Sequence, residues 1–282
     1  MTLLVALRPR QWPKNLLVFA GLIFAAEYDE PAKWGAAVAA FVAYCAASSA
    51  AYLVNDVLDA EEDRRHSSKR NRPVASGALA PERALAVAAL LAVAAVGIMA
   101  WFGWQSLAYM GGFMALQAAY SLRLKHVVLI DVMAIAALFV IRAAAGAEAV
   151  DVQISPWLIV CTALLALFLA LAKRRGELVS TAANGGGRAV LDGYSFALVD
   201  QLVSIVAACT IVAYSLYTFE AREGSAMMAT IPFVVFGLFR YLMLMHREDL
   251  GEEPENVLLT DVPILATIAL WALTSALILG FT

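Results

Sequence analysis

Long apolar runs dominate this chain and limit the folds open to it. A helix needs about 20 mostly apolar residues to cross the hydrocarbon core of a bilayer. Nine runs approach or reach that length, and the first is expected to begin earlier, near Trp12. They cover residues 16–27, 34–54, 83–102, 106–120, 128–146, 157–172, 195–217, 227–245 and 262–280. We therefore predict an all-α, polytopic membrane protein with nine transmembrane helices, whose partner is the lipid bilayer.

The overall composition agrees with a membrane protein. Of the 282 residues, 62% are hydrophobic and 15% are charged, whereas soluble domains are about a quarter charged. The net charge of −3 does not suggest a nucleic-acid partner. The three cysteines all lie inside apolar runs and form no CxxC pair, so we interpret them as small core residues. No cleavable signal peptide is evident, and the first run is interpreted as a retained span.

The Lys and Arg residues between the runs predict the orientation. Sixteen of the 20 lie before the first run or in alternate connections, two lie in the other connections, and two lie inside runs. Positive charge collects on the cytoplasmic side of membrane proteins. We therefore expect a plasma (inner) membrane protein with a cytoplasmic N-terminus, whose longest polar connections also face the cytoplasm.

Carboxylates cluster at the end of the second run. The segment reads Asn55-Asp56-Val-Leu-Asp59-Ala-Glu-Glu-Asp63. If the helix continues, these side chains share one face by their i, i+3 and i+4 spacing. Carboxylates gathered in this way repel one another unless a cation lies among them, and Mg²⁺ commonly bridges carboxylates to substrate phosphates. We predict a Mg²⁺ site formed by Asp56, Asp59 and Asp63; the alternative is a solvated acidic helix end.

Basic residues follow the acidic segment directly, and they suit a polyphosphate ligand. We single out Lys69 and Arg72, with Arg64 beside the carboxylates. The alternative is that they are ordinary positive-inside residues. One further cation, Arg142, lies inside the fifth run, eleven residues after Asp131 and so on the same helical face. Ionisable groups inside spans usually face the protein interior and function. A structural ion pair is the alternative for Arg142, and simple solvation is the alternative for Asp131.

The two polar segments resemble the first aspartate-rich motif of the UbiA superfamily of intramembrane prenyltransferases. Arg72-Pro73-x-Ala75-Ser76-Gly77 and Tyr120-Ser-Leu-x-Leu-Lys125 also match that superfamily. The resemblance covers essentially the whole chain. It implies one domain over residues 1–282, with nine helices around a central cavity open to the cytoplasm, and it adds Asn55, Tyr120 and Lys125 to the substrate-binding residues.

The chain departs from that superfamily after the sixth run. Aromatic prenyltransferases of the superfamily carry a second acidic motif there, but this chain has Lys173, Arg174 and Arg175. That pattern resembles the decaprenyl-phosphate phosphoribosyltransferase branch of mycobacterial and corynebacterial cell-wall synthesis. The opening segment 8–15 resembles the same branch and adds Lys14 to the binding residues. A third resemblance is Arg240-Tyr241, followed by His246 and an acidic stretch at 252–261.

The branch resemblance implies transfer of phosphoribose from 5-phosphoribosyl 1-diphosphate to decaprenyl phosphate. Metal and nearby cations would neutralise the leaving diphosphate, while C1 gains oxocarbenium character. The cations at 173–175 would hold either the ribose 5-phosphate or the lipid phosphate. Two rival functions are an aromatic prenyltransferase, which needs the second acidic motif, and a transporter, whose charges would lie at mid-membrane. The sequence leaves a homo-oligomer open.

Overall fold

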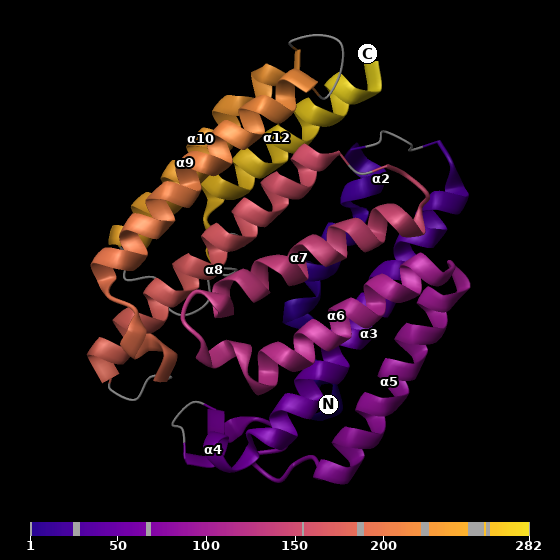
Figure 1. Cartoon of the computed structure of the whole chain (residues 1–282), viewed down its shortest axis with the longest axis vertical. Coiled ribbons are helices and arrows are strands. Elements are labelled where there is room, and N and C mark those ends of the chain that lie inside the picture. Colours follow the sequence, from indigo (N-terminus) through magenta and orange to yellow (C-terminus); the bar gives the residue numbers. More distant parts are fainter. Residues whose placement is uncertain are drawn as a thin grey trace. The chain divides into compact units, whose positions relative to one another are not determined.

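The computed structural model describes residues 2–24, 29–65, 69–153, 155–184, 189–220, 226–247, 257 and 260–281. Every regular element in these ranges is a helix, which confirms the all-α prediction (Figure 1). Contacts divide the chain into two compact units. The first contains Met1–Leu122 and Ile141–Gln153, and the second contains Arg123–Val140 and Ile154–Thr282.

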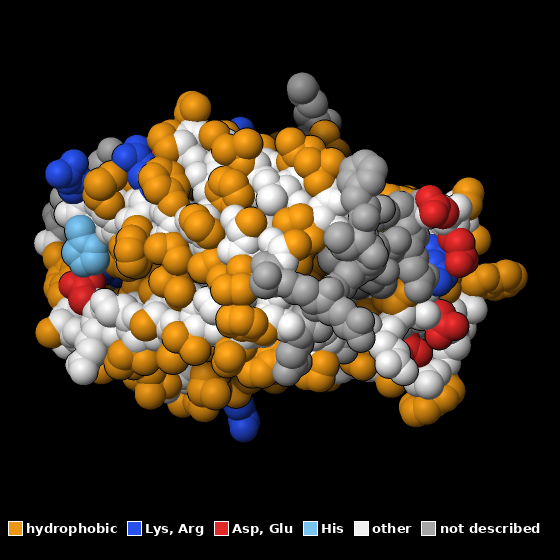
Figure 2. Space-filling view, turned by 90° about the horizontal axis from the view of Figure 1, so that it is seen from above, with side chains coloured by type: hydrophobic (Ala, Val, Ile, Leu, Met, Phe, Trp, Pro, Cys, Tyr) orange, Lys and Arg blue, Asp and Glu red, His pale blue; other side chains and the backbone are white. Residues whose placement is uncertain are grey.

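Six helices in the described ranges are long and apolar enough to cross a membrane. One of them is α10 counted together with η5 (Ala226–Thr230). The six are α3 (Pro31–Leu58), α5 (Pro81–Trp101), α7 (Ile130–Ala149), α8 (Pro156–Asn184), α9 (Phe196–Glu220) and α10 (Ile231–Arg247). Hydrophobic side chains are spread widely over the face shown in Figure 2, as expected where lipid replaces water as the solvent. The chain is therefore a multi-pass membrane protein.

In the first unit, α3 packs along α5 and also contacts α6 (Trp104–Leu122) (Figure 1). Small residues allow the close approach, because Ala84 and Ala88 of α5 are buried in one cluster with Leu53 of α3. The α3 helix continues to Leu58, four residues beyond the predicted span. The short helix α4 (Ala60–Arg65) follows, and then the 3₁₀ turn η2 (Lys69–Asn71). The acidic segment therefore lies at a junction between two helices.

The N-terminal part of this unit differs from the predicted first span. After α1 (Thr2–Ala6), the chain forms an 11-residue 3₁₀ helix, η1 (Pro9–Phe19), and then the short α2 (Ala20–Phe24). Such a long 3₁₀ helix is uncommon. Pro9 occupies its first turn, where a missing N–H costs little, but Pro13 lies inside it. Arg8 precedes η1 with a left-handed backbone (φ 53°), which is unusual for a non-glycine residue.

In the second unit, α8 packs along α9, and α10 packs along α12 (Val262–Phe281) (Figure 1). Its core includes Phe168 and Tyr241, whose rings meet edge to face at 5.2 Å. The 3₁₀ turns η3 (Leu124–His126) and η4 (Ala189–Gly193) also belong to this unit. The α8 helix continues 12 residues past the predicted end of the sixth span, at 172. Lys173, Arg174 and Arg175 therefore lie within a helix and not in the connection expected from the sequence.

Candidate functional site

Two carboxylates of the acidic segment meet at the guanidinium of Arg72. Nη1 of Arg72 donates to Oδ2 of Asp63 at 2.7 Å and lies 3.5 Å from Oδ1 of Asp56. Both aspartates are buried; Asp56 lies in the last turn of α3, and Asp63 lies in α4. The two carboxylates therefore lie close together, as expected, although the predicted continuous helix is interrupted between them at Asp59. Oxygen ligands of this kind fit Mg²⁺, which commonly takes one or two carboxylates and completes its shell with phosphates and water.

Asp59 does not join this pair into a three-carboxylate group. It is the residue between α3 and α4, and its backbone has left the helical region (φ −92°, ψ 5°). The described residues contain no group of three His, Cys, Asp or Glu side chains that could hold one metal ion. The break at Asp59 explains the difference, because face-sharing by i+3 and i+4 spacing requires an uninterrupted helix. Asp59 as a third metal ligand stays a prediction.

Arg8 is a member of this cluster that was not among the predicted binding residues. Its Nη2 donates to Oδ1 of Asp56 at 2.5 Å, and its guanidinium lies 4.8 Å from the ring centroid of Tyr52. From the sequence, Arg8 was counted only among the cations that predict the cytoplasmic side, and 48 residues separate it from Asp56. The only signal in the sequence was that Arg8 belongs to the opening segment 8–15, which resembles the phosphoribosyltransferase branch. We call Arg8, Asp56, Asp63 and Arg72 the acidic–basic cluster.

The other predicted residues of the first unit occupy varied positions. Arg64 is exposed, and its Nε donates to the carbonyl of Ala75, which ties α4 to the following loop. Lys69 begins η2, three residues before Arg72. Three more are half-buried, in η1, α3 and α6 respectively: Lys14, Asn55 and Tyr120. The roles of these five residues in substrate binding stay predictions.

Arg142 forms a second polar centre in the first unit. It lies in α7 and is buried, and its Nε donates to Oδ1 of Asn15 at 2.7 Å. Its guanidinium also lies 4.7 Å from the ring centroid of Phe113 in α6. Asn15 is 127 residues away in sequence and was not predicted as a site residue. The contact joins η1 to α7, two elements that no sequence pattern pairs.

In the second unit, the predicted cation Arg174 is fully buried. Its Nε lies 2.9 Å from Oδ2 of Asp131, without hydrogen-bond alignment, and its Nη1 donates to Glu177. The hydroxyl of Tyr194 donates to Oδ1 of Asp131 at 2.7 Å. Burial, followed by this hydrogen bond, raises the pKa of Tyr194. Asp131 is therefore buried and paired, and the alternative that it is solvated is wrong.

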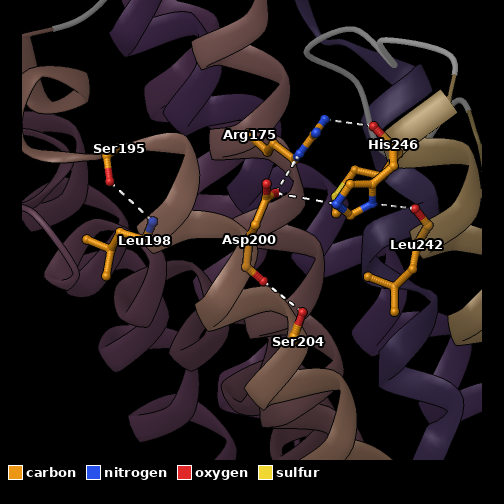
Figure 3. A network of polar contacts seen from close by, with 8 residues as sticks. Arg175, Ser195, Leu198, Asp200, Ser204, Leu242 and His246 are labelled. Atoms are coloured by element: carbon orange, nitrogen blue, oxygen red, sulfur yellow. Dashed lines mark hydrogen bonds and ion pairs between the residues drawn. The ribbon is translucent and has the colours of Figure 1, made fainter.

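The neighbouring Arg175 points toward α9 and α10 (Figure 3). Its Nε donates to Oδ1 of Asp200 at 2.7 Å, and its Nη1 donates to the carbonyl of Met245 at 2.7 Å. Nε2 of His246 lies 3.7 Å from the same Asp200 oxygen. Arg175 thus links three helices of the second unit, while the half-buried Lys173 and Lys125 lie in α8 and η3.

Arg240, from the last predicted motif, joins α10 to α12. Its Nε and Nη2 donate to the two carboxylate oxygens of Asp261 at 3.3 and 2.9 Å. Oδ1 of Asp261 also accepts from the backbone N–H of Ile264 at the start of α12. The hydrogen bonds from Arg240 hold the pKa of Asp261 below its usual value. The acidic stretch at 252–256 lies outside the described residues.

Comparison with known proteins identifies the family. The profile of the UbiA prenyltransferase family matches residues 16–260. The chain belongs to the UbiA prenyltransferase family. Within that family, the chain is 35% identical to the decaprenyl-phosphate phosphoribosyltransferase of Mycolicibacterium smegmatis, over 92% of this chain and 86% of the relative. It is 32% identical to the enzyme of the same name from Corynebacterium glutamicum, over 94% of this chain and 82% of the relative.

Solved structures of the UbiA family share the fold. The structure of a UbiA homolog from Archaeoglobus fulgidus, bound to DMAPP and Mg²⁺, superposes with a TM-score of 0.76 and covers 100% of both chains. The sequence identity is 17%. At that identity the likeness establishes the helical fold of the UbiA family for this chain and does not extend to its substrates.

Proposed function

We propose that this chain transfers the phosphoribosyl group of 5-phosphoribosyl 1-diphosphate to a polyprenyl phosphate, decaprenyl phosphate, and releases diphosphate. The observation that best supports this proposal is the 32–35% identity, over more than nine-tenths of the chain, to relatives named decaprenyl-phosphate phosphoribosyltransferase. The product would be a precursor for cell-wall arabinan. The acidic–basic cluster supports the proposal, because it combines metal-binding carboxylates with guanidinium groups that suit phosphate oxygens.

In this proposal, Asp56 and Asp63 hold Mg²⁺, with Asp59 as the third ligand predicted from the sequence. When bound, Mg²⁺ neutralises charge on the departing diphosphate. Arg72 lies within reach of both carboxylates, so it can turn toward phosphate oxygens when a cation replaces it there. The remaining proposed substrate-binding residues are Lys14, Asn55, Arg64, Lys69, Tyr120, Lys125, Arg142, Lys173, Arg174 and Arg175.

The chemistry needs no strong general base. An oxygen of the lipid phosphate forms a bond to C1 of the ribose, while the bond from C1 to the diphosphate oxygen breaks. The attacking phosphate is already anionic, so no proton has to leave it. The residues of this chain would therefore act by positioning both phosphates and by stabilising negative charge on the leaving group.

The membrane arrangement is part of the proposal. We propose nine crossing segments around a central cavity, with the N-terminus and the acidic–basic cluster on the cytoplasmic side of the plasma membrane. The distribution of Lys and Arg supports this orientation, with 16 on the expected cytoplasmic side and two on the other. The described residues include six helices of spanning length, with η1, α6 and α12 as further segments.

Labelled substrates test this proposal directly. The purified protein, in nanodiscs with decaprenyl phosphate and Mg²⁺, should transfer label from ribose-labelled phosphoribosyl diphosphate into lipid. A parallel reaction would contain labelled dimethylallyl diphosphate and 4-hydroxybenzoate. Incorporation of the prenyl label into the aromatic acid, with none of the ribose label entering lipid, would establish the rival aromatic prenyltransferase activity.

A further inference from the structure

We infer that Tyr194 is a positioning residue that sets the place of Lys125, through the strained turn that joins η3 to α7. The inference rests on the proposed function, in which Lys125 binds a phosphate group of a substrate. It adds to that function a residue of the α8–α9 connection, from which the sequence predicted no site residue. The ligand is a phosphate of either the ribose donor or the lipid acceptor.

The turn between η3 and α7 contains an unfavourable backbone conformation. Leu129 lies one residue before α7 and has a left-handed backbone, with φ 67°. That conformation is costly for a residue with a bulky side chain, whereas glycine adopts it freely. The side chain of Leu129 is 44% exposed, so its own packing does not hold the backbone there. Residues in such a conformation persist only where the surrounding contacts over-determine them.

The hydroxyl of Tyr194 supplies such contacts to the turn. It accepts the backbone N–H of Leu129 at 2.8 Å and donates to Oδ1 of Asp131 at 2.7 Å. Asp131 is in turn held by Arg174, whose Nε lies 2.9 Å from Oδ2. Tyr194 is 6% exposed, and hydrogen bonds are stronger in such low-dielectric surroundings than in water. One buried hydroxyl therefore ties the strained residue to the first turn of α7.

The residue before Tyr194 is packed against the same turn. A Cβ at Gly193 would collide with Cγ2 of Val128. A side chain at position 193 would therefore displace Val128 from η4, which ends at Gly193. Consecutive residues 193 and 194 thus contact consecutive residues 128 and 129. These paired contacts fix the place of the turn relative to the α8–α9 connection.

Backbone hydrogen bonds transmit this placement to Lys125. Lys125 is the middle residue of η3 and is half-buried. The N–H of Val127 donates to the carbonyl of Leu124 at 3.1 Å, and the N–H of Asp131 donates to the carbonyl of Val127 at 3.0 Å. The turn of η3 is thus bonded through Val127 to the start of α7. Because Leu129 lies inside this bonded segment, a change in its conformation would rotate η3 and move the ammonium group of Lys125.

A positioning role and a purely structural role differ in what removal of Lys125 does. If the hydroxyl of Tyr194 only stabilises the fold, its loss acts whether or not Lys125 is present. If it positions Lys125, its loss has no further effect on substrate binding once that side chain is gone. A second distinction comes from position 129. Glycine there would adopt the left-handed conformation without strain, so the hydroxyl would become dispensable.

The test is steady-state kinetics of label transfer by the full-length protein in nanodiscs, with each substrate varied in turn. Lys125→Ala identifies the substrate whose phosphate Lys125 binds, since the KM for that substrate should rise about tenfold or more. Tyr194→Phe should raise the same KM about three- to tenfold, as for coupled residues, while kcat stays within about twofold. The double variant Tyr194→Phe/Lys125→Ala should have the KM of Lys125→Ala alone. In Tyr194→Phe/Leu129→Gly, the KM should return to within about twofold of wild type.

Tyr214→Phe is the matched control. Tyr214 is also 6% exposed, and its hydroxyl likewise has two partners, Thr230 and Nε1 of Trp271, both at 2.7 Å. Its loss removes a buried hydroxyl from the same unit without touching the turn before α7. The Tm of this variant should fall, while both KM values stay at those of wild type.

Unchanged KM values in Tyr194→Phe or in Lys125→Ala would overturn the inference, and so would effects of the two substitutions that multiply in the double variant. If Tyr194→Phe alone does not fold, the substitution is made in the Leu129→Gly background, where a raised KM overturns the inference. The proposed function is judged separately, because it fails only if wild type transfers no label from phosphoribosyl diphosphate.

Discussion

Arg174 of α8 and Asp131 of α7 form an ion pair in which both side chains are 0% exposed. The Nε of the arginine lies 2.9 Å from the carboxylate, and Glu177 engages its Nη1. Two carboxylates of its own unit thus engage this cation, which the sequence predicted to bind a phosphate.

We expect Arg174→Gln to lower the free energy of unfolding by about 3–5 kcal/mol, because it leaves two buried carboxylates without their cation. Thermal and denaturant unfolding in detergent would measure the loss. Arg175→Gln is the matched control, and its effect should be smaller because its partner Asp200 is partly exposed. The double variant Asp131→Asn/Arg174→Gln should recover part of the loss. An Arg174→Gln protein as stable as wild type would contradict this prediction.

Removal of divalent metal should abolish the transfer reaction. Asp56 and Asp63 are buried carboxylates that converge on Arg72, so they suit Mg²⁺ when the diphosphate is present. Activity would be measured in excess EDTA and again after Mg²⁺ is added back. Full turnover in the chelator would rule out the proposed metal role.

Asparagine substitutions test the acidic segment residue by residue. Asp56→Asn and Asp63→Asn keep the shape and remove a charge, and each should lower kcat at least about 100-fold. Asp59→Asn examines the predicted third ligand, for which we expect a loss of similar size. If Asp59→Asn is active at wild-type rates while the other two are not, the metal site contains two carboxylates and not three.

Gly146→Ala should strongly destabilise the first unit. Its Cβ would meet the backbone of η1, which cannot move as a flexible side chain would. We expect a loss of about 3 kcal/mol, at the upper end of the usual cost of overpacking. Gly111→Ala in α6 is the matched control, because nothing lies within 4 Å of the Cβ position there. Equal stability of the two variants would show that the η1–α7 contact is not as close as described.

Lys173→Ala tests the remaining cation of the 173–175 group for phosphate binding. The KM for phosphoribosyl diphosphate or for the lipid phosphate should rise about ten- to a hundredfold, as expected for loss of a charge-assisted hydrogen bond. Steady-state kinetics with each substrate varied in turn would show which of the two KM values rises. A KM within twofold of wild type for both substrates would favour the alternative that Lys173 only contributes to orientation.

The sequence predicted what depends on neighbours along the chain. The apolar runs gave the helices, and the spacing from Asp56 to Asp63 gave two carboxylates on one side of the α3–α4 junction. Arg72 follows within a short loop, so its contact with them was also within reach of sequence reasoning. Contacts between segments that are distant in sequence could not be predicted. No local pattern pairs Asn15 with Arg142, or Arg8 with Asp56.

The cations at 173–175 show a second limit of prediction from the sequence. They were predicted to lie in a connection, where three adjacent charges can serve one ligand. In the structure they continue α8, and successive residues of an α-helix point about 100° apart. Arg174 therefore turns toward Asp131 while Arg175 turns toward Asp200. The apolar run ended at 172 because charge increased there, but helical propensity did not end with it.

The winding of η1 makes the N-terminal segment sensitive to length. Each residue of a 3₁₀ helix advances the chain by about 2 Å and turns it by about 120°. Deleting or inserting one residue between Arg8 and Asn15 would therefore rotate Asn15 by a third of a turn, away from α7, while Arg8 stayed beside Asp56. Surface residues of η1, such as the exposed Leu16, can vary in identity without this effect. Homologous chains should thus vary in the residues of this segment far more readily than in their number.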